Sequence, residues 1–230
     1  MMPKHLGSDI EDIEDILFKI EKSYDIKFET NELSHIRTFG ELCDHIILKL
    51  KQEQADDCTG QQAFYKLREV ILTIKQLDKS KVQTDTLLSF IFPRHRRRKQ
   101  IVEIESKLGF KIKALRAKYF VSGAVFAILF GSFIELFFNW KFGLAGLASS
   151  IILIKIVGKT AKEFTVKTIG ELADKISQEN YLKARRNPAT VNRNEIVKKI
   201  EQMFIRDLAL GKTVKEITPE TIIVERRIKI

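Results

Sequence analysis

The two longest apolar stretches of the chain are neighbours in its second half. From Tyr119 to Phe138 the sequence runs almost without charge, and a second apolar run extends from Phe142 to Gly158. The first run is long enough, as a helix, to cross a hydrocarbon core of about 30 Å, and the second is at the short limit. With Asn139-Trp140-Lys141 as the connection, the pattern predicts a transmembrane helical hairpin over residues 119–158.

A buried helical hairpin in a soluble domain is the alternative, because a helix that is apolar all round also occurs in protein cores. Small residues recur at four-residue spacing at Gly123, Ala127 and Gly131, and again at Gly146 and Ser150. In lipid this spacing lets helices approach closely, either within one chain or between chains. The sequence therefore leaves open a homo-oligomer formed through the hairpin.

Outside the hairpin, apolar positions seldom alternate with the period of two that a half-buried strand requires. The hydrophobic fraction is 44%, and only 4 prolines and 11 glycines interrupt the chain. We expect an all-α fold, made of small helical bundles with the hairpin inserted in the second. No pattern typical of a catalytic, cofactor or metal site emerges, so we expect a non-enzymatic protein that needs no cofactor.

Positive charge is concentrated beside the hairpin. The segment from Arg94 to Lys118 contains ten basic and two acidic residues, within a chain of net charge +10. The positive-inside rule then predicts a two-pass protein of the inner membrane with both termini in the cytoplasm. An anionic membrane surface is the expected partner of the run. The residues expected to contact lipid headgroups are Arg94, Arg96, Arg97, Arg98 and Lys99.

A nucleic-acid interface is the alternative interpretation of residues 94–99, because clustered cations also neutralise phosphates. No recognisable nucleic-acid-binding motif accompanies the run. We therefore favour the membrane over a soluble nucleic-acid-binding protein.

The soluble parts contain an internal repeat. The segment Thr38-Phe39-Gly40-Glu41-Leu42-Cys43-Asp44-His45-Ile46 is echoed by Thr168-Ile169-Gly170-Glu171-Leu172-Ala173-Asp174-Lys175-Ile176. Each threonine is placed to cap the helix that follows it. Upstream of each copy, an amphipathic helix ends in a short apolar motif, Tyr24 to Phe28 in one case and Leu108 to Ile112 in the other.

Leu6-Gly7-Ser8-Asp9-Ile10 resembles the Leu-Gly-x-Asp-Ser signature of the acyl carrier proteins. The resemblance extends to Glu11–Glu21 as the recognition helix and to Thr38–Ile46 as the last helix, and it implies small carrier-like bundles. Ile10 occupies the position of the serine that carries phosphopantetheine in that family, so a degenerate, unmodified module is expected. The alternative is a functional acyl carrier with the prosthetic group on Ser8. Ser8 and Glu11 otherwise form a capping box at the helix start.

The resemblance divides the chain into a first module that lacks its opening helix, a second module interrupted by the hairpin, and a final fragment. Because the final fragment resembles an opening helix with its loop, we hypothesise that it completes the first module, either within the chain or in another protein. The expected ranges are 6–50 for the first module, 62–118 with 162–178 for the second, 119–158 for the hairpin and 193–230 for the fragment.

Carrier proteins are recognised through an acidic second helix, so the resemblance implies a protein-binding surface in the first module. An acyl or lipid enzyme is the expected class of partner, and charge would steer its association. The residues expected to contact it are Asp9, Glu11, Asp12, Glu14 and Asp15. Cys43 and His45 lie two positions apart on a helix and so face different sides. We expect Cys43 to serve packing and not catalysis.

Overall fold

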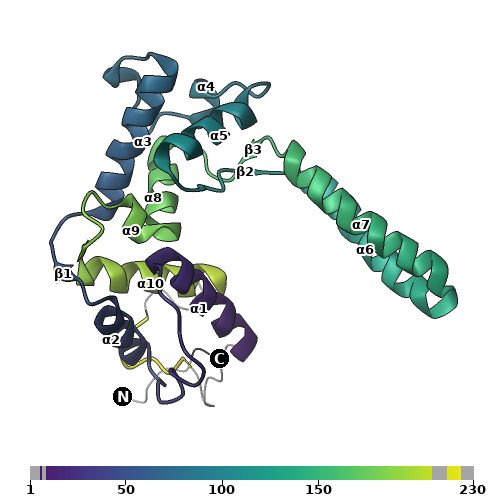
Figure 1. Ribbon diagram of the computed structural model, residues 1–230, viewed down its shortest axis with the longest axis horizontal. Helices are drawn as coiled ribbons and strands as arrows, with labels where there is room; N and C mark the ends of the chain where they lie inside the picture. The colour runs from purple at the N-terminus through teal and green to yellow at the C-terminus, as the bar shows by residue number, and fades with distance from the viewer. Residues whose placement is uncertain (1–5, 7–8, 209–216, 224–230) are drawn as a thin grey trace. The chain divides into compact units, whose positions relative to one another are not determined.

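The computed structural model describes residues 6, 9–208 and 217–223, and it is mostly helical (Figure 1). The predicted all-α fold is confirmed. The α-helices are α1 (Ile10–Tyr24), α2 (Phe39–Leu50), α3 (Thr59–Lys75), α4 (Leu88–Ile91), α5 (Arg97–Leu108), α6 (Tyr119–Phe138), α7 (Trp140–Thr160), α8 (Ile169–Glu179), α9 (Tyr181–Ala184) and α10 (Arg193–Asp207), with a 3-10 turn at Lys79–Lys81.

The strands have two residues each. β1 (Glu53–Gln54) pairs in parallel with β4 (Thr190–Val191), and β2 (Leu115–Arg116) pairs antiparallel with β3 (Glu163–Phe164). The chain forms two compact units: unit 1 comprises Met1–Lys66 and Ala173–Ile230, and unit 2 comprises Leu67–Leu172. Unit 1 is therefore wider than the ranges 6–50 and 193–230, because residues 51–66 and 173–192 also belong to it.

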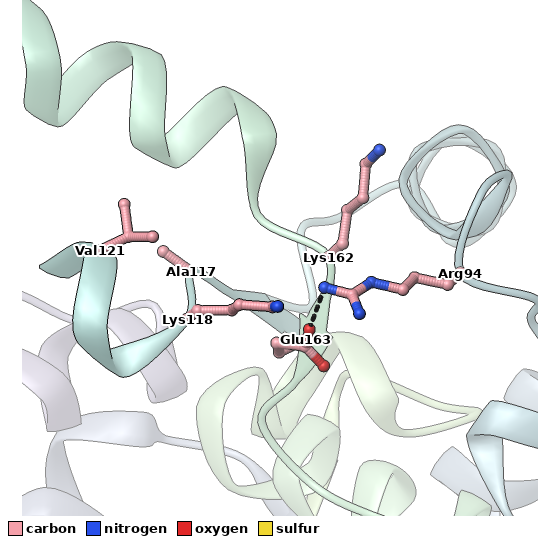
Figure 2. Close-up of a pocket in the computed structure, with 6 residues that line it drawn as sticks. All are labelled: Arg94, Ala117, Lys118, Val121, Lys162 and Glu163. Atoms are coloured by element: carbon pink, nitrogen blue, oxygen red, sulfur yellow. Dashed lines mark ion pairs between the residues drawn. The ribbon is translucent and has the colours of Figure 1, made fainter.

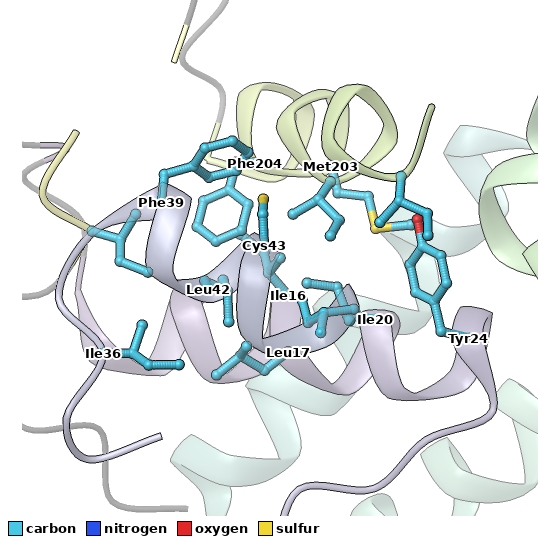
Figure 3. Close-up of a cluster of buried hydrophobic side chains, with 14 of the residues drawn as sticks. Ile16, Leu17, Ile20, Tyr24, Ile36, Phe39, Leu42, Cys43, Met203 and Phe204 are labelled. Carbon is cyan, nitrogen blue, oxygen red and sulfur yellow. The ribbon is translucent and has the colours of Figure 1, made fainter. Parts of the chain in front are cut away.

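Unit 1 has one hydrophobic core built from both ends of the chain (Figure 3). The apolar faces of α1, α2 and α10 meet there, and Phe39 packs edge-on against Phe204 with ring centroids 5.7 Å apart. Residues 217–223 add Ile217 and Ile223 to the same cluster. The described part of the segment 193–230 thus lies in one core with residues 6–50, in the same chain.

The repeated segments have the same local structure in the two units. Thr38 caps α2, as predicted, and it does so through a capping box with Glu41. In unit 2 the Glu171 amide donates to Thr168 Oγ1 at 3.1 Å. The glycine after each cap fits closely against a loop: a Cβ on Gly40 would lie 3.0 Å from Pro219 Cβ, and one on Gly170 would lie 2.8 Å from the Thr84 carbonyl oxygen.

The loop against each capped helix is also repeated, but it comes from a different part of the chain. In unit 1, residues 217–223 follow α10 and pair with residues 37–40; in unit 2, residues 82–88 precede α8 and pair with residues 167–170. The Gly40 amide donates to the Pro219 carbonyl at 2.9 Å, and the Gly170 amide donates to the Thr84 carbonyl at 2.8 Å. In the first repeat the loop therefore follows its capped helix in the chain, and in the second it precedes it, so the two repeats supply the same parts in permuted order.

The ends of α1 and α5 match as well. Each helix stops at a residue in the left-handed region, Asp25 with φ 53° and Gly109 with φ 78°. A glutamate one turn earlier then accepts an amide beyond the turn: Phe28 N donates to Glu21 Oε1 at 2.7 Å, and Ile112 N donates to Glu105 Oε1 at 3.0 Å. The apolar motifs after the two helices are thereby folded back into the cores.

A buried polar cluster within unit 1 ties α3 to α10. The carboxylate of Glu195 accepts the Thr59 amide at 3.0 Å and so caps the start of α3. Beside it, Arg185 is fully buried, and its Nη1 donates to Thr59 Oγ1 at 2.8 Å. Lys199 Nζ donates to Ser177 Oγ at 2.8 Å, and burial lowers the pKa of this lysine. These bonds satisfy several polar groups that would otherwise be costly to bury, although Arg185 Nε itself has no hydrogen-bond partner.

The contribution of α10 to unit 1 is testable at Phe204. Because Phe204 is fully buried, Phe204→Ala is expected to cost about 3–5 kcal/mol of stability and to lower hydrogen-exchange protection throughout α1 and α2. Phe18→Ala is the matched control, because Phe18 is 66% exposed on α1, and it should cost less than about 0.5 kcal/mol. Unchanged protection in α1 and α2 after Phe204→Ala would contradict a shared core.

Glu32, in the loop between α1 and α2, makes the stability of unit 1 depend on pH. Burial raises the pKa of its carboxyl, but hydrogen bonds from Lys49 Nζ at 2.7 Å, the Glu29 amide and His45 outweigh burial and lower it to about 2. The folded pKa lies below the unfolded value of 4.5. Glu32 therefore stabilises the fold above pH 4.5, and this contribution is lost as the pH falls towards 2.

The difference in unfolding free energy between the native chain and Glu32→Gln should accordingly be largest near pH 6 and shrink towards pH 3. Urea denaturation at several pH values measures it. Glu29→Gln, which removes an exposed carboxylate from the same loop, serves as the control and should change little across this range. A constant difference would rule out the assigned role.

Candidate membrane anchor and the basic residues beside it

The helices α6 and α7 lie side by side as an antiparallel hairpin (Figure 1). The apolar segments Tyr119–Phe138 and Trp140–Gly158 contain 20 and 19 residues with mean hydropathies of 2.0 and 1.6, and only 6% and 11% of their most apolar windows are buried. A core hairpin of a soluble protein would be mostly covered. Within the part of the chain that the structure describes, two helices are long and apolar enough to cross a membrane.

The hairpin closes through small residues on one face. A Cβ on Gly143 would lie 2.7 Å from the Leu136 amide nitrogen, and a Cβ on Gly146 would lie 2.8 Å from Ser132 Cβ. Ser150, on the same face of α7, is fully buried. The predicted pair Gly146 and Ser150 therefore serves contact within the chain.

The other predicted small-residue series does not take part in this contact. Gly123 and Gly131 have no atom within 4 Å of an added Cβ, apart from neighbouring residues and their own helix backbone, and Ala127 between them is exposed. An oligomer through this face of α6 remains a prediction.

One member of the basic run belongs to the interior of unit 2. Arg97 is only 7% exposed. Its Nε donates to the Phe92 carbonyl at 3.2 Å, its Nη1 donates to the Lys162 carbonyl, and its guanidinium carbon lies 4.3 Å from the centre of the Phe164 ring. Burial lowers the pKa of this side chain. Two donor groups of Arg97 are therefore engaged with backbone carbonyls beside the hairpin, which does not support the predicted contact with lipid headgroups.

The remaining basic residues are at or near the surface. Arg94, Arg96 and Lys99 are exposed, and Arg94 pairs with Glu163 at 2.7 Å. Arg98 donates through Nη1 to the carbonyl of Gly158, near the end of α7, at 2.7 Å. These four cations keep the predicted role at lipid headgroups, and Arg98 in addition attaches α5 to the base of the hairpin.

A cavity of roughly 130 Å³ lies at the base of the hairpin. Figure 2 shows its lining, in which the Lys118 side chain extends towards the ion pair between Arg94 and Glu163. Lys118 immediately precedes α6, and Lys162 follows α7 by two residues. The complete lining is Arg94, Ala117, Lys118, Val121, Lys162 and Glu163.

Sequence reasoning did not single out Lys118 or Lys162 as contact residues. Their signal was present in the sequence, because Lys118 directly precedes the apolar hairpin and Lys162 lies four residues after its end at Gly158. Only the antiparallel packing of α6 and α7, with the pairing of β2 and β3, brings the two ends together.

The acidic residues predicted to bind a protein partner lie at the start of α1. Asp9, Glu11, Asp12 and Asp15 are exposed and Glu14 is half-buried, while the opposite face of the helix points into the core of unit 1. Asp9 occupies the N-cap position of α1 without a side-chain capping bond. Ser8 itself lies outside the described residues.

Cys43 has the packing role expected of it. The side chain is 2% exposed in the core of unit 1, and burial, together with nearby Asp44 and Glu201, raises the pKa of its thiol to about 12. His45 Nε2 instead pairs with Glu32 at 2.8 Å. Among the described residues, no three His, Cys, Asp or Glu side chains are grouped as metal ligands.

No family model matches the chain, and searches of curated proteins and of solved structures found no match. The resemblance to acyl carrier proteins therefore remains a prediction that rests on the residues quoted above.

The close contact in the hairpin predicts opposite behaviour for two glycines. Gly146→Val should force α6 and α7 apart and cost about 1–3 kcal/mol, whereas Gly131→Val adds a side chain into open space. Trp140, the single tryptophan, lies at the tip of the hairpin, so its fluorescence during a detergent-denaturant titration reports unfolding. The Gly146 variant should unfold at lower denaturant than the Gly131 variant, and equal midpoints would refute the assigned contact.

Proposed function

We propose that this protein is a two-pass, non-catalytic membrane adaptor that holds degenerate acyl-carrier-like helical units at the cytoplasmic face of the inner membrane. The observation that carries the proposal is the uncovered apolar surface of α6 and α7, of whose most apolar windows only 6% and 11% are buried. Lipid is the environment that would cover such a surface without cost.

The composition of unit 1 supports an even number of crossings. Its core contains residues 6–50, which precede the hairpin, and residues of α10, which follow it. Both segments must lie on one side of a membrane to share a core, and two crossings satisfy this requirement. The cations at the base of the hairpin, set against Lys141 at its tip, support the cytoplasmic side.

The adaptor role rests on the two charged surfaces. The exposed carboxylates at the start of α1 would attract a basic protein surface and repel an acidic one. We assign this face to an acyl or lipid enzyme, and the basic residues of unit 2 to anionic headgroups. Ile10, at the place of the modified serine in the family that the sequence resembles, supports a role without a prosthetic group.

Membrane fractionation with alkaline carbonate extraction, followed by intact mass, tests the proposal. The expected result is protein that stays in the extracted pellet at its unmodified mass. Release into the soluble fraction would refute the anchor. A mass increase equal to one phosphopantetheine would instead favour a functional carrier.

The native cysteines provide a test of topology. Cys58 is exposed, whereas Cys43 is buried with a raised thiol pKa, so a membrane-impermeant maleimide should label Cys58 selectively, because the thiolate is the reactive form. Labelling is expected in inverted inner-membrane vesicles and not in intact spheroplasts. A Lys141→Cys variant in a Cys58→Ser background should show the reverse pattern, and labelling of Cys58 from outside would contradict the orientation.

A further inference from the structure

We propose that the cavity at the base of the hairpin binds the phosphate of one anionic phospholipid, held by Lys118 and Arg94, with Lys162 beside them at the cavity edge. This inference rests on the membrane anchoring proposed above, and it goes beyond a general attraction between the basic run and a charged surface. It assigns one lipid molecule to one built site, of which Lys118 and Lys162 lie outside the clustered basic run of residues 94–99.

The charge of the cavity suits an anion. Three cationic side chains line it against the single carboxylate of Glu163. Arg94 forms an ion pair with Glu163 at 2.7 Å, and Lys118 extends towards the same pair (Figure 2). A phosphate oxygen entering here would accept charge-assisted hydrogen bonds from Lys118 and from Arg94, in competition with Glu163.

The start of α6 adds to the positive potential. This helix of 20 residues begins directly after Lys118, and no side chain caps it. The positive end of its dipole therefore lies at the cavity wall, where an anion is stabilised.

The position and the apolar side of the cavity indicate a phospholipid and not a soluble phosphate. Lys118 and Lys162 flank the two apolar segments, so in a bilayer the cavity lies at the level of the headgroups. Ala117 and Val121 form its apolar wall. Val121 belongs to the first turn of α6, and the exposed apolar side chains of that helix continue from it, which gives an acyl chain a path from the bound phosphate into the membrane.

The test measures lipid retention by native mass spectrometry of the full-length protein in detergent, titrated with phosphatidylglycerol or with phosphatidylcholine. The native chain should retain one phosphatidylglycerol in preference to phosphatidylcholine. Arg94→Gln with Lys118→Gln removes two cations of the cavity and should weaken this binding about tenfold or more, since a bond to a charged group is worth about 1.5–3 kcal/mol.

The matched control is Arg96→Gln with Lys99→Gln, which removes two exposed charges of the same basic run outside the cavity lining. Arg96 and Lys99 can contribute general attraction to headgroups, so this variant should weaken binding by a clearly smaller factor than the cavity variant. Equal losses in the two double variants would overturn the proposal in favour of diffuse attraction, which weakens by a similar amount for each charge removed near the surface.

Glu163→Gln should have the opposite effect on lipid binding. It removes the carboxylate that competes for Arg94, so it should tighten phosphatidylglycerol binding severalfold, and weaker binding by a normally folded variant would overturn the proposal. Inorganic phosphate at millimolar concentration should not displace the lipid; efficient displacement would identify a free-phosphate site instead. Carbonate extraction of each variant tests the membrane anchor separately from the lipid site. A protein that stays in the pellet but does not retain phosphatidylglycerol in preference to phosphatidylcholine refutes only the lipid site.

Discussion

The packing of Phe39 on α2 against Phe204 on α10 sets the constraint on which the rest of the structure depends. These two residues belong to segments on either side of the apolar hairpin, and both are fully or almost fully buried in the core of unit 1. A chain that enters a membrane between them must return to the same side. The core of unit 1 and the number of crossings are therefore linked: one helix in lipid would separate the halves of the core, whereas a hairpin leaves them together.

The two units reach the same local structure with different chain orders. The capped helix, its close-fitting glycine and the loop against it recur with matching hydrogen bonds, although the loop precedes the hairpin in unit 2 and follows it in unit 1. At the position where unit 2 is continuous, the Phe90 amide donates to the Leu87 carbonyl at 3.1 Å. In unit 1 the same bond joins the two ends of the chain, from the Leu6 amide to the Ile222 carbonyl at 3.0 Å. Packing depends on which side chains meet and not on the order in which the chain supplies them, which is why a permuted order is tolerated.

The basic run illustrates how one kind of residue divides between folding and surface chemistry. Arg97 has its guanidinium over Phe164 and donates to the backbone carbonyls of Phe92 and Lys162. It therefore links the start of α5 to the segment that follows α7. Arg94, three residues before Arg97, remains exposed and pairs with Glu163 at the cavity. The cations that hold the base together and those that remain exposed are thus interleaved along α5 and the residues before it, next to the start of α6.

The sequence by itself determined the elements whose causes are local. Twenty apolar residues, a polar connection and a second apolar run predict a hairpin because length and hydropathy alone decide whether a helix suits lipid, and Thr38 with Glu41 predicts a helix start because a capping box lies within four residues. Only the tertiary structure decided the features that join distant segments: the burial of Arg97, the contact of Gly143 with Leu136, and the cavity between Lys118 and Arg94. Each depends on how whole elements pack, and packing is settled by the fit of surfaces that are far apart in the sequence.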